Sequence, residues 1–220
     1  MTAELESFIC SEFETCTLAA NKPKVDVAIE LGYVTQHNIK QLQTINSVVF
    51  PIIYNPSFYQ DVLNEHSALS RLAYCNDLVV GAVCGRIENT ESCRRLYIMT
   101  LGVLESYRHL GIGSKLLDFV MKTALDDKTI SGVYLHVQTS NEQAINFYKK
   151  SGFELSGVLE NYYRNLDTTS AYLVVKLFPD RLSKPSSKYM QSIEEQTQNS
   201  QSGLPVVKTH KFSHKAKRKH

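Results

Sequence analysis

The segment Arg108-His109-Leu110-Gly111-Ile112-Gly113 decides the fold class, because it stands between a strand pattern and a helical pattern. Residues 94–103 before it have the composition of a buried strand, and Leu116, Leu117 and Val120 after it recur at helical spacing. Glycines in such a turn let backbone N–H groups approach an anion. The start of the following helix adds unpaired N–H groups and the positive end of the helix dipole. The segment therefore indicates a site for a phosphate or a pyrophosphate.

Neither of the two common nucleotide-binding loops matches this segment. Position 116 is leucine, where the dinucleotide-binding pattern G-x-G-x-x-G needs its third glycine. A Walker A loop ends in Gly-Lys followed by Ser or Thr, and the residues after Gly113 do not supply that triplet. A tight turn without a ligand would also explain two glycines, so this segment alone leaves the function open.

A second segment predicts a capped helix that ends in a sharp turn: Asn141-Glu142-Gln143-Ala144-Ile145-Asn146-Phe147-Tyr148-Lys149-Lys150-Ser151-Gly152-Phe153. Asparagine is a preferred N-cap, and glycine suits the left-handed position after a helix. Taken alone, Asn141 is a plain cap and Tyr148 a packing tyrosine. The short apolar run 133–137 between the two segments predicts a buried strand.

The rest of the pattern completes one α/β domain. Helices are expected after caps at Thr35 and Ser57, and Phe50-Pro51 should end the first of them because proline cannot continue a helix. The order of elements, β-α-α-β-β-β-α-β-α-β-β, predicts a mixed sheet flanked by helices. Strands are expected at 27–33, 69–74, 78–87, 94–103, 133–137, 154–158 and 171–177.

Three regions follow from composition: an acidic arm at 1–25, the domain at 26–178, and a basic tail at 179–220. The tail is rich in Ser, Gln and Lys, has few apolar residues, and should be disordered. It carries no acidic residue after Glu195. Such a tail can stay solvated, contact ribosomal RNA nonspecifically, or serve as a nuclear import signal through 215–219.

Several classes of protein are excluded by the composition. The chain has no run of about 18 apolar residues, so we expect no membrane-spanning helix, and we see no secretion signal. The five cysteines are scattered, and no two form a C-x-x-C pair. They read as free thiols of a cytoplasmic protein, neither a disulfide scaffold nor a zinc site.

Together the two segments resemble the acetyl-CoA-binding core of the GNAT acetyltransferases, R-x-x-G-x-G followed by N-x-x-A-x-x-F-Y-x-x-x-G-F. Further stretches resemble the NatE-type N-terminal acetyltransferases: Phe50-Pro51-Ile52-Ile53-Tyr54, Arg95-Leu96-Tyr97-Ile98-Met99-Thr100-Leu101-Gly102, Tyr134-Leu135-His136-Val137 and Asn161-Tyr162-Tyr163. The resemblance covers residues 27–178. It implies the GNAT fold and an enzyme that moves an acetyl group from acetyl-CoA to the α-amino group of protein N-termini, without a metal.

The resemblance also implies where acetyl-CoA lies. In this family the central strand splays away from the next strand, and the pantetheine arm occupies the gap and pairs with the backbone of 101–103. The hydroxyl of Tyr148 would then donate a proton to the leaving thiolate. The residues expected to hold acetyl-CoA are Leu101, Gly102, Val103, Arg108, His109, Leu110, Gly111, Ile112, Gly113, Ser114, Asn141, Ala144, Phe147, Tyr148 and Lys150.

Tyr97 and His136 are the candidate bases. An α-amino group has a pKa of about 7.7–8.0, so much of it must lose a proton before it can attack. On their residues alone, a histidine in an apolar strand is more often a core residue, and Tyr97 fits a packing aromatic. The resemblance implies that the pair acts as base through an ordered water.

The expected substrate is a protein N-terminus with a retained methionine and a hydrophobic second residue. A covered apolar slot admits a peptide end more readily than a lysine in mid-chain. A NatA-type acetyltransferase complex and the ribosome are the implied partners, with a link to sister chromatid cohesion. A lysine acetyltransferase and a weakly active docking subunit remain alternatives. The residues expected around the first side chain are Phe50, Pro51, Ile52, Tyr54, Met99, Tyr162 and Tyr163.

Overall fold

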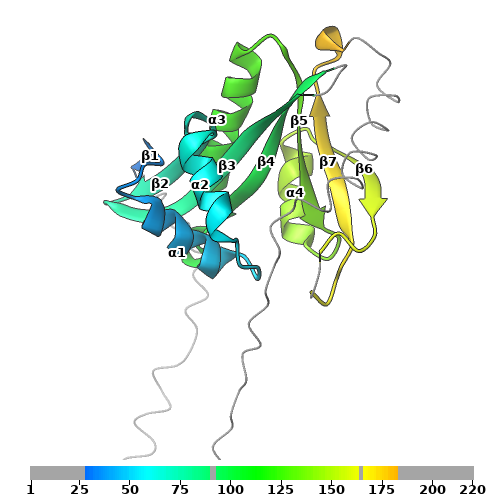
Figure 1. The fold of residues 1–220 in the computed structure, drawn as a ribbon. Coiled ribbons are helices and arrows are strands. Elements are labelled where there is room, and N and C mark those ends of the chain that lie inside the picture. The colour runs from blue at the N-terminus through cyan, green and yellow to red at the C-terminus, as the bar shows by residue number, and fades with distance from the viewer. Residues whose placement is uncertain (1–27, 90–92, 164–165, 183–220) are drawn as a thin grey trace, which may run out of the picture.

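A seven-stranded sheet runs through the protein in the order β1-β2-β3-β4-β5-β7-β6 (Figure 1). The computed structural model describes residues 28–89, 93–163 and 166–182. All neighbouring strands are antiparallel except β4 and β5, which are parallel because α3 crosses over between them. The strands are β1 (Ile29–Tyr33), β2 (Ser70–Cys75), β3 (Leu78–Asn89), β4 (Arg94–Val103), β5 (Ile130–Gln138), β6 (Glu154–Leu159) and β7 (Ala171–Leu177).

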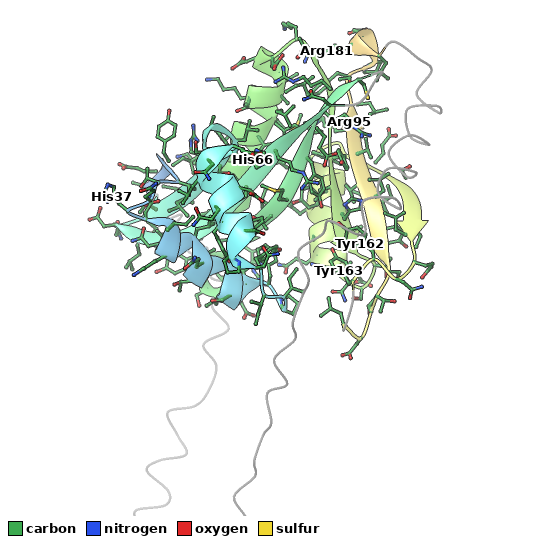
Figure 2. The ribbon with its side chains drawn as sticks, viewed as in Figure 1. His37, His66, Arg95, Tyr162, Tyr163 and Arg181 are labelled. Carbon is green, nitrogen blue, oxygen red and sulfur yellow. The ribbon has the colours of Figure 1, made fainter. Side chains whose placement is uncertain are left out.

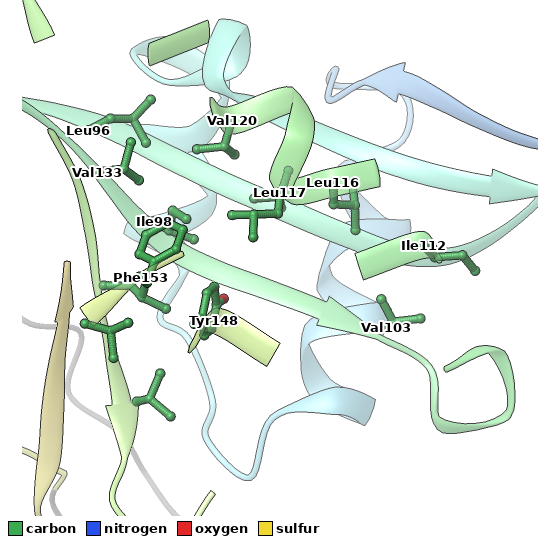
Figure 3. Packing of buried hydrophobic residues seen from close by; sticks show 14 of the residues in the cluster. Leu96, Ile98, Val103, Ile112, Leu116, Leu117, Val120, Val133, Tyr148 and Phe153 are labelled. Atoms are coloured by element: carbon green, nitrogen blue, oxygen red, sulfur yellow. The ribbon is translucent and has the colours of Figure 1, made fainter. Parts of the chain in front are cut away.

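Four helices cover the two faces of this sheet: α1 (Ile39–Val49), α2 (Pro56–Asn64), α3 (Ile112–Asp126) and α4 (Glu142–Lys150). Successive strand residues point to opposite faces, so Leu72 packs with α1 and α2, whereas Ala73 packs with α3. The larger core lies under α3 and α4, and Figure 3 shows Leu116, Leu117, Val120 and Tyr148 there against the strands. The predicted α/β fold and the order of its elements are confirmed.

Two of the predicted helix caps were wrong. Helix α1 begins after Asn38, whose Oδ1 accepts a hydrogen bond from the Thr35 N–H at 2.7 Å, so Thr35 only opens the preceding turn. Helix α2 is capped by Asn55, whose Oδ1 accepts from the Phe58 N–H at 3.0 Å. In both places asparagine, which bonds well to nearby backbone, stands close to the predicted Thr or Ser.

Arg181 fixes the C-terminal end of the domain through hydrogen bonds to backbone carbonyl groups. Its guanidinium donates to the carbonyl oxygens of Ala124, Leu125, Asp127 and Ile130 at 3.0–3.2 Å, which closes the C-terminal end of α3. This packing continues past the predicted boundary at residue 178, through the short turn Pro179–Arg181. The predictions for the arm at 1–25 and for the tail from 183 onward lie outside the described residues.

Within the three described ranges, no helix is long and apolar enough to cross a bilayer.

Candidate active site

The glycine turn is built as an anion site. Gly111 is the residue before α3 and has a left-handed backbone with φ 79°. A Cβ at Gly111 would meet nothing within 4 Å, so the space beside the turn is open. No side chain caps α3 and its first turn has no acidic residue, so the first N–H groups of α3 have no side-chain partner within the described structure. These features fit the diphosphate predicted for this turn.

Arg108 and Gln143 join the two predicted segments. The Arg108 Nη1 donates to the Gln143 Oε1 at 3.3 Å, and the Arg108 Nε donates to the Val103 carbonyl at the same distance. Asn141 accepts from the Ala144 N–H at 3.1 Å, which confirms it as the cap of α4. The starts of α3 and α4 therefore lie next to each other at the carboxyl end of β4, where α/β sheets bind ligands.

Strands β4 and β5 diverge at the centre of the sheet. Their parallel ladder ends at Tyr97 and Tyr134, although β4 continues to Val103 and β5 to Gln138. The ladder between β3 and β4 also shifts there, since Cys84 pairs with Thr100 and Gly85 with Ile98, which leaves Met99 as a bulge. Residues 101–103 pair with β3 on one edge, and no strand of the described ranges pairs with them on the other. This free backbone edge fits the predicted place of a pantetheine arm.

Tyr97, His136 and Tyr162 form a closed cluster at this divergence. The Tyr97 hydroxyl lies 3.2 Å from the His136 Nδ1 and 3.2 Å from the Tyr162 hydroxyl. The Tyr162 hydroxyl lies 3.1 Å from the same Nδ1, and its ring stacks on the imidazole with centroids 4.4 Å apart. The pairing of Tyr97 with His136 matches the sequence-based expectation, whereas Tyr162 was expected only at the rim.

Burial sets the protonation of this cluster. Burial, with the nearby Arg86 charge, lowers the pKa of His136 from 6.5 to about 3, so the imidazole is neutral near pH 7. Burial also raises the pKa of Tyr97 and, more strongly, that of Tyr162, so both phenols keep their protons. The His136 Nε2 is buried and makes no hydrogen bond to any described residue. The cluster therefore presents a neutral imidazole with one uncommitted nitrogen.

The loop between α1 and α2 lies near the turn after β6. The rings of Phe50 and Tyr54 are in edge-to-face contact with centroids 6.0 Å apart. Burial raises the pKa of Tyr54, and Tyr163 and Tyr97 raise it further, which places these three phenols close together. Figure 2 shows Tyr162 and Tyr163 next to each other at one end of the sheet face. Met99 packs against both the α1–α2 core and the apolar group formed by Tyr97, Tyr134, Leu173 and Val175.

The other predicted residues are only partly brought together. Tyr148 is buried in α4, and burial raises the pKa of its hydroxyl, which keeps it protonated. Ile52 is half-buried, whereas Pro51, His109, Leu110 and Ser114 are exposed. Lys150 lies in the last turn of α4, at the opposite end of that helix from Asn141. Ala144, Phe147 and Ile112 pack in or against the core beneath the turn.

Sequence reasoning missed the central place of Tyr162 and the charged residues behind Tyr97. Asn161 has a left-handed backbone with φ 56°, and it turns the chain just before Tyr162. An asparagine two residues beyond the end of β6 was the available signal. Arg86 lies over the Tyr97 ring, 4.9 Å from its centroid, and bonds to Glu88.

Comparison with known proteins agrees with this geometry. Residues 39–153 match the model of the acetyltransferase (GNAT) family. The chain belongs to the GNAT acetyltransferase family. It is 49% identical over 160 residues to the zebrafish (Danio rerio) N-alpha-acetyltransferase 50, covering 73% of this chain and 95% of that protein. It is 54% identical over 149 residues to the probable N-acetyltransferase san of Drosophila melanogaster, covering 68% of this chain and 80% of that protein.

A solved structure with the same fold is that of Arabidopsis thaliana Naa50 in complex with the bisubstrate analogue CoA-Ac-MVNAL. It is 44% identical, with a TM-score of 0.65, and the match covers 69% of this chain and all of that one. This acetyltransferase is thus an N-terminal acetyltransferase that uses acetyl-CoA as acetyl donor. Its described residues contain no group of three or more His, Cys, Asp or Glu side chains that could hold a metal ion.

Proposed function

We propose that this acetyltransferase modifies N-termini that begin with a retained methionine followed by a hydrophobic residue. The observation that carries the proposal is the Tyr97–His136–Tyr162 cluster, which lies where β4 and β5 diverge. Aromatic and apolar residues of the α1–α2 loop and of the turn after β6 surround that point. The peptide in the bisubstrate complex of Arabidopsis Naa50, MVNAL, has this kind of N-terminus.

Acetyl-CoA supplies a thioester whose carbonyl carbon is attacked by the α-amino group. In the proposal, Gly111, Gly113 and the start of α3 bind the diphosphate, and the free edge of 101–103 orients the arm. A backbone N–H near Leu101 stabilises the oxyanion. The Tyr148 hydroxyl, which stays protonated, donates to the departing sulfur.

Tyr97 and His136 remove the proton from the amine in this proposal, through a water molecule. A neutral imidazole does not repel the approaching ammonium group, and its free Nε2 can bond to that water. A pKa of about 3 also means that the proton does not remain on His136. In this proposal the pair therefore orients the water that takes the proton from the amine.

The test measures acetyl transfer from radiolabelled acetyl-CoA to two peptides. One begins Met-Leu with a free amine, and the other has the same sequence with a blocked N-terminus and an internal lysine. We expect transfer to the free N-terminus alone, reduced about 100-fold by His136→Ala and by Tyr97→Phe. The matched control is His37→Ala, because His37 is exposed at the β1 side of the sheet, far from Tyr162 (Figure 2).

Other results would favour the alternatives. Transfer mainly to the blocked peptide would make the protein a lysine acetyltransferase. Binding of acetyl-CoA without transfer to either peptide would indicate a docking subunit. Association with a NatA-type complex and the ribosome, a cytoplasmic or nuclear location, and a role in cohesion stay predictions. Co-sedimentation of the full chain with ribosomes at low and high salt tests the ribosome contact.

A further inference from the structure

Glu88 holds two side chains with its two carboxylate oxygens. The Arg86 Nε and Nη2 donate to Oε1 at 2.9 and 2.6 Å. The Tyr134 hydroxyl donates to Oε2. Glu88 lies on β3 and Tyr134 on β5, so this carboxylate ties two strands together across β4.

Strand register places these groups around one residue. Arg86 and Glu88 are two apart on β3 and share a face of the sheet. Arg86 is opposite Tyr97 on β4, and Tyr97 is opposite Tyr134 on β5. The Arg86 guanidinium lies 4.9 Å from the centroid of the Tyr97 ring, and the Tyr134 ring lies 4.9 Å from it as well. Arg86 and Tyr134 are thus two of the neighbours of the Tyr97 ring, and both are held by Glu88. The His136 ring also contacts the Tyr97 ring, with centroids 5.5 Å apart.

The hydrogen bonds of Glu88 are strengthened by partial burial and by the packing of its partner Tyr134. The side chain of Glu88 is 22% exposed, so the ion pair with Arg86 is only partly screened by water. The guanidinium of the fully buried Arg95 lies over the Tyr134 ring, 5.2 Å from its centroid, and limits the movement of Tyr134. Both carboxylate oxygens of Glu88 are engaged, Oε1 by the charged Arg86 and Oε2 by Tyr134, so the carboxylate is held at two points.

We propose that Glu88 is a positioning residue for the Tyr97 hydroxyl. It acts through Arg86 and Tyr134, which hold the Tyr97 ring in the orientation that brings its hydroxyl to His136. The inference rests on the catalytic role proposed for Tyr97. Glu88 is not among the residues proposed to contact acetyl-CoA or the peptide, and its effect reaches the reaction by way of Tyr97.

Double-mutant kinetics test this coupling with acetyl-CoA and the Met-Leu peptide. Glu88→Gln keeps the size of the side chain but removes its charge and one acceptor, and we expect kcat to fall about tenfold. The KM for acetyl-CoA should change by less than about twofold, because the donor contacts are elsewhere. Tyr134→Phe removes only the hydroxyl and should lower kcat about threefold. In a Tyr97→Phe background, both changes should have no further effect.

Equal losses from Glu88→Gln in the wild-type and Tyr97→Phe backgrounds would overturn the proposal, since Glu88 would then act without Tyr97. The matched control is Glu30→Gln, which changes an exposed glutamate on the far strand β1 and should keep full turnover.

A separate readout is the 15N NMR signal of the His136 ring nitrogens. If Tyr97→Phe keeps wild-type turnover, the role proposed for Tyr97 fails, and only this NMR signal then tests whether Glu88 positions Tyr97. A changed 15N chemical shift of His136 in Glu88→Gln supports the proposal, and an unchanged chemical shift overturns it.

Discussion

The Tyr162 ring stacks on the His136 imidazole, with centroids 4.4 Å apart and an interplanar angle of 25°, while its hydroxyl reaches the Nδ1 of the same residue at 3.1 Å. The Tyr162 side chain thereby fixes the plane of the imidazole ring by stacking and takes part in the hydrogen bonding of its Nδ1. Tyr162 comes from the turn after β6, which ties this turn to the β5 residue proposed to carry the proton.

Removing parts of Tyr162 should separate these two functions. Tyr162→Phe keeps the stacked ring but loses the hydroxyl, and we expect kcat/KM for the Met-Leu peptide to fall about tenfold. Tyr162→Ala loses the ring as well and should fall about 100-fold. Steady-state acetyl transfer at saturating acetyl-CoA measures both. Equal losses in the two variants would show that stacking contributes nothing.

The pH dependence of stability should carry a signal from His136. Its pKa is lowered from 6.5 to about 3 in the folded state, so the unfolded chain binds more protons between these values. The stability that this site contributes is complete above pH 6.5 and is lost as the pH falls toward 3. Replacing His136 by Gln should flatten the dependence of the unfolding free energy on pH in that window.

Urea unfolding at a series of pH values from 7 to 4 measures this slope. His37→Gln is the control, because an exposed histidine should leave the slope unchanged. A slope for the His136 variant equal to that of the wild type would contradict the lowered pKa.

Two glycine substitutions should affect different substrates. A Cβ at Gly102 would lie 2.7 Å from a Val49 methyl and 3.0 Å from the Phe50 ring, so Gly102→Ala must push the end of α1 away from β4. We expect a loss of about 1–3 kcal/mol in stability and a higher KM for the peptide, because Phe50 moves. Thermal unfolding and peptide kinetics measure these effects.

Gly113→Ala is the contrasting change. Its Cβ would make ordinary contacts with Phe147 at 3.6 Å, and alanine favours the helix, so stability should stay the same or rise. Gly113 belongs to the turn proposed to bind the diphosphate, so acetyl-CoA binding should weaken when a methyl is added there. Calorimetric titration with acetyl-CoA separates the two variants, and a peptide defect in Gly113→Ala would contradict this assignment.

Arg181 should contribute to stability but not to turnover. Its two terminal nitrogens bond to four carbonyl groups between the last turn of α3 and the start of β5, far from Tyr162 (Figure 2). Arg181→Lys keeps the charge but loses the planar fork, and should reduce the unfolding free energy by about 2 kcal/mol. Urea unfolding measures the loss, and kcat at 20 °C should remain at the wild-type level. A fall in kcat without loss of stability would place Arg181 in the catalytic apparatus instead.

The strands and helices could be predicted because each carries its own local signal. The hairpin at Asn76 and Asp77 is an example, since both residues have the positive φ that these residue types tolerate. The predicted caps of α1 and α2 were wrong because several residues that can cap a helix stand close together, and the local sequence does not show which of them is used.

The group around Tyr97 could not be predicted, because it depends on register between strands that are distant in sequence. The bulge at Met99 shifts the β3–β4 ladder by one residue and so brings Arg86 opposite Tyr97. A register shift of one residue changes which cross-strand partner, and which face of the sheet, each later side chain meets. No local sequence pattern predicts such a shift. The resemblance named Tyr97 and His136 but carried no information on Glu88.

The divergence of β4 and β5 has a consequence for how this protein avoids unwanted association. Unpaired strand edges normally attract strands of other molecules, and proteins blunt them with charges, prolines or short outer strands. Here the unpaired edge of 101–103 faces inward between two strands of the same sheet. Because β5, β7 and β6 continue the sheet beyond it, this is not an outer edge to which a strand from a second molecule could add. The backbone edge proposed to pair with the acetyl donor is therefore not an outer edge of the sheet.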